Sequence, residues 1–134
     1  MNLCLEAAGH TLVVAIQAFS LLWTHSVERT EWREEWAIEG DRLLVVEAAV
    51  SATGAGMEIP DGAVLQDGAW HYRPDLPPQA RVAFADAGRP DSDWTLCAKD
   101  TCVSLRSVLP VRGEGFVMQA CDRPGVPLEA LAVR

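Results

Sequence analysis

The sequence predicts a single all-β domain, an antiparallel β-sandwich or barrel, with or without a short C-terminal helix. Short apolar or alternating segments, about eight in all, recur along the chain and are separated by glycine, proline or aspartate. No strand pattern alternates with a helical one, as a parallel sheet would require. With 134 residues, the chain is long enough for one hydrophobic core.

The N-terminal segment predicts a hairpin. Apolar residues alternate on both sides of Ala8-Gly9, a dipeptide that suits a tight turn. The alternating residues are Leu3 and Leu5 before the turn and Leu12, Val14 and Ile16 after it.

The next segment, residues 19–38, changes the parity of its apolar positions. Trp23 and Val27 have odd numbers, whereas Trp32 and Trp36 have even numbers. Because side chains alternate between the faces of a strand, one continuous strand would place these two sets on opposite faces. We therefore expect a bulge, bend or break between Val27 and Trp32.

A helix over residues 28–38 competes with the strand interpretation, because Glu, Arg and Trp tolerate helices and Gly40 would end one. The strand-like neighbours on both sides favour a strand. The turn at residues 39–41 then predicts antiparallel pairing with a buried strand from Leu43 to Val50.

The remaining elements are shorter. We expect one antiparallel β domain over residues 1–121 and a C-terminal tail over residues 122–134, which either is loose or ends in a short helix. The predicted strands after the irregular segment 51–68, which holds a short strand near Val64, lie at residues 70–72, 81–86 and 116–120, and a hairpin is predicted over residues 94–105.

Two of the four cysteines are predicted to face each other. Cys97 and Cys102 flank a short polar loop in a predicted hairpin, and their spacing differs from that of a zinc knuckle. An oxidising compartment would allow a Cys97–Cys102 disulfide, but two small, partly buried thiols are the simpler interpretation, above all in the cytosol.

Charge and hydropathy exclude two classes of partner. The net charge is −8, and the 11 basic residues are spread along the chain, which argues against nucleic acid. The apolar run 11–23 is too short to span a bilayer, and Glu6, with no basic residue, precedes it. We expect no membrane span and, for the chain as written, a cytoplasmic location. A misplaced or trimmed start would instead allow a periplasmic or membrane-associated location.

The order Trp-Thr-His-Ser-Val-Glu-Arg-Thr at 23–30, with Trp-Arg-Glu-Glu-Trp at 32–36 and Gly-Ala-Gly-Met at 54–57, resembles an uncharacterised bacterial family, domain of unknown function 1850. The resemblance runs from about Leu3 to about Leu105. Its members are often encoded beside TRAP transporters of the TAXI type, which implies a link to organic-anion uptake but no established activity. The resemblance implies that these residues occupy the family's motif positions: His25, Ser26, Glu28, Thr30, Gly54, Gly56 and Met57.

These motif residues form the candidate binding site. Consecutive N–H groups at 54–56 can form a concave anion nest, although a tight structural turn explains the glycines equally well. A glycine segment folded over Glu28 would place backbone donors beside His25, Ser26 and Thr30, and the group would suit a carboxylate or another small polar ligand. We expect a noncatalytic accessory or binding module for a small organic anion or a TRAP component, with no cofactor.

Two other functions stay open. His25 and Glu28 form a potential metal or proton-transfer pair, but a catalytic metal needs a third ligand, for which His10, Glu35 or His71 are available. Alternatively, the chain is a homo-oligomeric structural protein that pairs exposed strand edges.

Other residues have simpler explanations. Ser26 beside His25 is no nucleophile–base pair, since adjacent strand residues point apart and the Gly-x-Ser-x-Gly elbow is missing. We expect the acidic cluster of Glu31, Glu34 and Glu35 to form a solvated face. Core and cross-strand packing, rather than an aromatic ligand cage, is the simpler role for the five tryptophans: Trp23, Trp32, Trp36, Trp70 and Trp94.

Overall fold

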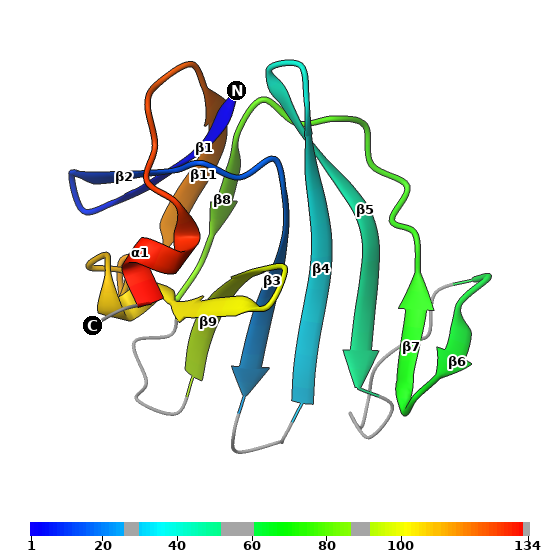
Figure 1. Cartoon of the computed structure of the whole chain (residues 1–134). Helices are drawn as coiled ribbons and strands as arrows, with labels where there is room; N and C mark the ends of the chain where they lie inside the picture. The colour runs from blue at the N-terminus through cyan, green and yellow to red at the C-terminus, as the bar shows by residue number, and fades with distance from the viewer. Residues whose placement is uncertain (26–29, 52–60, 87–91, 133–134) are drawn as a thin grey trace.

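The computed structural model describes residues 1–25, 30–51, 61–86 and 92–132, which form two antiparallel sheets (Figure 1). One sheet has the order β2-β1-β11-β8, and the other has the order β10-β9-β3-β4-β5-β7-β6. The elements are β1 (Asn2–Ala7), β2 (His10–Val14), β3 (Ala18–His25), β4 (Thr30–Glu39), β5 (Arg42–Ser51), β6 (Val64–Gln66), β7 (Ala69–Tyr72), β8 (Val82–Phe84), β9 (Ser92–Ala98), β10 (Thr101–Ser104), the 3-10 helix η1 (Leu105–Ser107), β11 (Phe116–Cys121) and α1 (Leu128–Ala132).

The parity change in residues 19–38 marks a chain reversal between two strands. In the β3–β4 register, Trp23 pairs with Trp32 and Phe19 pairs with Trp36. Odd-numbered residues of β3 thus face even-numbered residues of β4, so the parity changes while the face does not. The segment is interrupted between His25 and Thr30 and forms a hairpin; of the predicted interval Val27–Trp32, residues 27–29 lie outside the described ranges and residues 30–32 belong to β4. The strand interpretation of 30–38 is confirmed over the helix.

A bulge occurs further on, in the β4–β5 pair. Glu35 pairs with Glu47, but Trp36 pairs with Val45, so Val46 is the extra residue in β5. The bulge shifts the buried positions of β5 from odd to even numbers. Both sets therefore face inward: Leu43, Val45, Ala48 and Val50.

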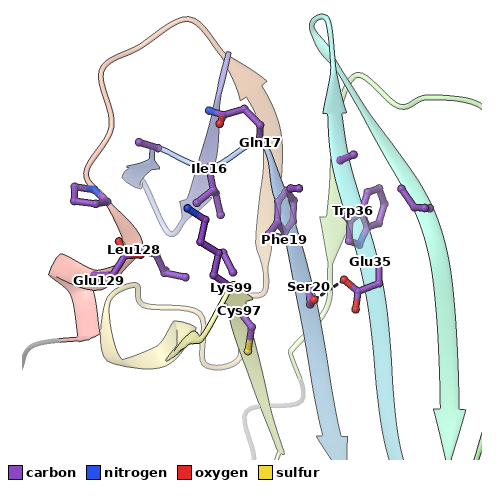
Figure 2. Close-up of a pocket in the computed structure, with 16 residues that line it drawn as sticks. Ile16, Gln17, Phe19, Ser20, Glu35, Trp36, Cys97, Lys99, Leu128 and Glu129 are labelled. Carbon is purple, nitrogen blue, oxygen red and sulfur yellow. Dashed lines mark hydrogen bonds between the residues drawn. The ribbon is translucent and has the colours of Figure 1, made fainter.

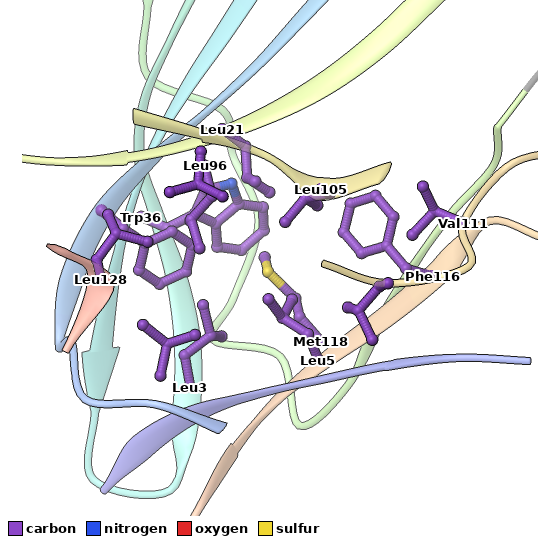
Figure 3. Close-up of a cluster of buried hydrophobic side chains, with 14 of the residues drawn as sticks. Leu3, Leu5, Leu21, Trp36, Leu96, Leu105, Val111, Phe116, Met118 and Leu128 are labelled. Carbon is purple, nitrogen blue, oxygen red and sulfur yellow. The ribbon is translucent and has the colours of Figure 1, made fainter. Parts of the chain in front are cut away.

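The hydrophobic core lies between the two sheets, so the predicted sandwich is confirmed (Figure 3). Leu3, Leu5 and Met118 enter it from the four-stranded sheet, opposite Leu21 and Leu96 of the seven-stranded sheet. Each of these side chains is almost completely buried, and full burial stabilises the fold by about 1.5–3 kcal/mol per side chain. Among the described residues, none from β6 or β7 belongs to the core. These two strands extend beyond the four-stranded sheet (Figure 1).

The residues after Cys121, predicted as a tail, pack back onto the sandwich. Val126 N–H donates to Val13 O at 2.9 Å, and Ala15 N–H donates to Val126 O at 2.8 Å. Helix α1 then buries Leu128 in the core, which confirms the expected short C-terminal helix. No helix within the described ranges has the length and apolar character needed to cross a membrane.

The four cysteines form two disulfides. Cys97 and Cys102 are direct cross-strand partners in the β9–β10 hairpin and are bonded to each other. The second disulfide, Cys4–Cys121, joins the first strand to the last. Sequence analysis gave Cys4 and Cys121 no pairing, because the β1–β11 contact brings together residues 117 positions apart.

Candidate functional site

The structure describes only part of the predicted motif site. His25 ends β3 and Thr30 begins β4, and the two are cross-strand partners. The other five predicted residues lie outside the described ranges: Ser26, Glu28, Gly54, Gly56 and Met57. Strands β3 and β5, which lead into the two motif segments, run in the same direction on either side of β4. They therefore stop at the same end of the sheet (Figure 1). Contact between the glycine segment and residues 25–30 stays a prediction.

The third metal ligands considered in the sequence are engaged elsewhere or remote. His71 Nδ1 lies 2.6 Å from Glu47 Oε1, and Glu35 is bonded to Ser20 and Arg33. His10 lies in β2, in the other sheet. Among residues 1–25, 30–51, 61–86 and 92–132, no three His, Cys, Asp or Glu residues are grouped so as to hold a metal ion.

One depression, of about 780 Å³, crosses β3 and β4 beside α1 (Figure 2). There Ser20 Oγ donates a 2.5 Å hydrogen bond to Glu35 Oε2, while Arg33 Nε contacts Glu35 Oε1 at 2.7 Å. The Cys97 sulfur at its margin is held in a disulfide, and the described lining contains no histidine that would accept the serine proton. The polar groups satisfy one another, so this arrangement stabilises the β3–β4 hairpin rather than activating a nucleophile.

A second depression, the tryptophan groove, lies on the inner face of the seven-stranded sheet and has a volume of about 570 Å³. It forms because β8, the edge strand of the covering sheet, has only three residues and ends at Phe84. Among the described residues that follow Phe84, Ala85 and Asp86 line one side of the groove. The described lining residues are Leu21, Trp23, Trp32, Glu34, Ala85, Asp86 and Trp94.

Three indole rings dominate this groove because their positions adjoin across three strands. Trp23 on the central strand pairs with Trp32 on one side and with Trp94 on the other. The Trp23 and Trp94 ring centroids are 6.3 Å apart, and Trp94 packs edge-on against Phe84 at 5.0 Å. Trp94 Nε1 also donates to Ala85 O at 3.0 Å, which fixes the ring's orientation. The Trp94 ring is therefore held in place before any ligand binds.

Glu34 brings a carboxylate to the same face. Trp36 Nε1 donates to Glu34 Oε1 at 3.3 Å, and burial raises the pKa of Glu34 above its ordinary value. Burial also raises the pKa of Tyr72, and the negative charge of Glu34 raises it further. The expected solvated face is thus wrong for Glu34, although Glu31 is exposed.

Sequence reasoning missed Glu34 although the signal was present. In a strand, Trp32, Glu34 and Trp36 share one face, because alternate residues point the same way. Asp86 carried no such signal, since its place in the groove depends on where β8 ends. The described lining residues include these two carboxylates and no basic side chain.

Comparison with known proteins identifies a family. The family model for Domain of unknown function (DUF1850) matches residues 19–105, more than half of the chain. The match begins at β3 and takes in the whole seven-stranded sheet, including Trp23, Trp32, Glu34 and Trp94, while β1, β2 and β11 lie outside it. No curated protein and no solved structure matches significantly. The chain therefore belongs to the family Domain of unknown function (DUF1850).

Proposed function

We propose that this protein is a noncatalytic binding module that holds a small ligand and serves TRAP-type organic-anion transport. The tryptophan groove carries the binding part of this proposal. Apolar, aromatic-lined depressions with a few placed polar groups are typical of small-molecule sites. The transport link is supported by the family resemblance, because family members are often encoded beside TRAP transporters.

Two groove residues are close in sequence to motif positions of the β3–β4 hairpin. Trp23 lies two residues before His25, and Trp32 lies two residues after Thr30. A ligand that packs against these tryptophans extends toward the end of the sheet at which β3 ends and β4 begins. In this proposal Glu28 and the segment 54–57 contribute the contacts that recognise a carboxylate, with backbone N–H groups as donors.

Thermal melting of the purified chain with a panel of small mono- and dicarboxylates tests the binding function. A ligand that binds only the folded state raises the melting temperature by mass action. We expect Glu28→Ala and Gly54→Ala to reduce this rise more than they change the melting temperature without ligand. Glu129→Ala, an exposed change on α1, is the matched control and leaves the response unchanged. Melting that no carboxylate shifts would remove the organic-anion part of the proposal.

The transport link needs a separate test. Purified TRAP components encoded beside the gene are mixed one at a time with the chain and analysed by size-exclusion chromatography. Co-elution with one component supports the link, and separate elution from each component contradicts it.

Edge pairing between copies is the second candidate, and β6 favours it. This strand forms one edge of the seven-stranded sheet, and Val64 and Leu65 are 61% and 54% exposed. Light scattering across a dilution series separates the two functions, because a monomer at every concentration excludes a structural homo-oligomer.

A further inference from the structure

We propose that the tryptophan groove binds the alkylammonium group of a small organic cation. This inference rests on the proposed binding function and specifies the chemistry of one end of the ligand. An organic acid that also carries an alkylammonium group would satisfy both proposals.

The aromatic surface suits such a group. An organic cation is attracted to the negative face of an aromatic ring, most strongly to tryptophan, and aromatic cages are a recurrent site for quaternary ammonium groups. Trp23, Trp32 and Trp94 supply three indoles in adjoining positions of β3, β4 and β9. Since packing against Phe84 and the hydrogen bond to Ala85 already fix Trp94, binding costs little ordering of this ring.

The charge of the groove selects a cation. Glu34 and Asp86 are both acidic, and the described lining residues contain no lysine, arginine or histidine. Asp86 Oδ2 accepts a hydrogen bond from Gly113 N–H at 2.9 Å, so the selection by charge depends on Glu34. A carboxylate placed here would meet the like charge of Glu34, whereas an alkylammonium group meets an opposite charge. A compact metal ion would have to give up its water shell in favour of an apolar lining, which a methylated ammonium does not require.

Among the three indole N–H groups of the groove, that of Trp94 is not available to a neutral polar ligand such as a sugar. Trp94 Nε1 is committed to Ala85 O, and the neighbouring Trp36 Nε1 is committed to Glu34 Oε1. Glu34 keeps acceptor capacity, because a carboxylate offers about four lone-pair sites and one described hydrogen bond occupies Oε1. The site therefore offers π-faces and negative charge, the two features that an organic cation uses.

Choline is the probe, and 3,3-dimethylbutan-1-ol, in which carbon replaces the charged nitrogen, is its neutral isostere. We expect choline to quench tryptophan fluorescence saturably and to bind at least about tenfold more tightly than the isostere. Isothermal titration calorimetry on the full chain checks the affinity independently. Equal affinities would overturn the inference, because the groove would then recognise shape without charge.

Two variants assign the effect to the groove. Glu34→Gln keeps the side-chain shape and an acceptor for Trp36 Nε1, so we expect choline affinity to fall about tenfold with isostere affinity unchanged. Trp32→Leu lowers choline affinity by removing one π-face. Glu31→Gln is the control, because this exposed β4 residue has the opposite parity from the groove residues Trp32 and Glu34. Unchanged choline affinity in folded Glu34→Gln or Trp32→Leu would contradict the proposal.

The remaining outcomes separate this inference from the proposed function. If carboxylates raise the melting temperature and choline does not bind to the chain, the cation site is overturned but the proposed binding function is not. A chain that responds to neither class loses both. The segments that continue from His25 and Asp86 contain Arg29 and Arg89. Choline binding that occurs only in an Arg29→Gln/Arg89→Gln variant would overturn the inference, because a cation of this chain would then fill the groove.

Discussion

Replacement of both Cys4 and Cys121 by alanine is expected to lower the free energy of unfolding by about 5 kcal/mol. A disulfide restricts the unfolded chain, and in the chain-entropy model its contribution grows with the logarithm of the loop that it closes. This disulfide spans 117 residues, nearly the whole chain. Domains of this size are stable by about 5–15 kcal/mol, so the variant is expected to lie near the limit of folding at physiological temperature.

The second disulfide is the internal control. Cys97–Cys102 spans only 5 residues, and the same relation predicts about 2 kcal/mol for its double alanine variant. Cys4 and Cys97 are similarly buried, at 4% and 7% exposure, so the loss of packing at these two positions is comparable. The difference of about 3 kcal/mol then reports loop length.

Equilibrium unfolding in guanidinium chloride, followed by tryptophan fluorescence and circular dichroism, measures both variants against the unmodified oxidised chain. Equal losses for the two pairs, or a larger loss for Cys97–Cys102, would refute the argument from loop length. Reduction of the unmodified chain should reproduce the larger effect when both disulfides open.

Two further predictions concern stability. Gly125→Ala is expected to cost about 1–3 kcal/mol in urea unfolding, because its Cβ would lie 2.9 Å from Ala15 N and Val14 C; an unchanged midpoint would contradict this contact. Burial raises the pKa of Glu34 in the folded chain above its value in the unfolded chain. Glu34 therefore contributes most to stability at a pH below its unfolded pKa, and this contribution is lost as the pH rises through its folded pKa. Glu34→Gln should therefore raise the free energy of unfolding relative to wild type at about pH 8 but not at about pH 4, and an equal difference at both would refute the assignment.

The local strand pattern was accessible from the sequence because it depends on neighbouring residues. Alternation around Ala8-Gly9 predicted the β1–β2 hairpin, and the turn at residues 39–41 predicted the pairing of β4 with β5. The parity change before Trp32 predicted an irregularity but not a reversal of the chain, because a bulge within one strand and a hairpin between two strands can produce the same exchange of odd for even positions. The bulge at Val46 left no comparable signal, because the register shift depends on how the paired β4 strand packs.

The candidate site was less accessible than the fold. The motif positions came from resemblance, and the structure describes only the backbone positions of His25 and Thr30 among them. The pairing of Trp23 with Trp94 joins strands separated by five others in the sequence, and no local pattern reports it. The charge of Glu34 and its acidic neighbours predicted a solvated side chain, whereas strand alternation with Trp32 and Trp36 places Glu34 on the inner face.

By itself, the sequence determined the all-β class, the order of most strands and the hairpins between neighbours, because period-two alternation and turn chemistry act over a few residues. Only the tertiary structure decided that β1 pairs with β11, that the strands form a sandwich and not a barrel, and that three distant tryptophans meet beside Glu34. These contacts depend on which faces are buried together across the whole chain. Burial on folding is a property of the assembled sandwich and not of any one segment.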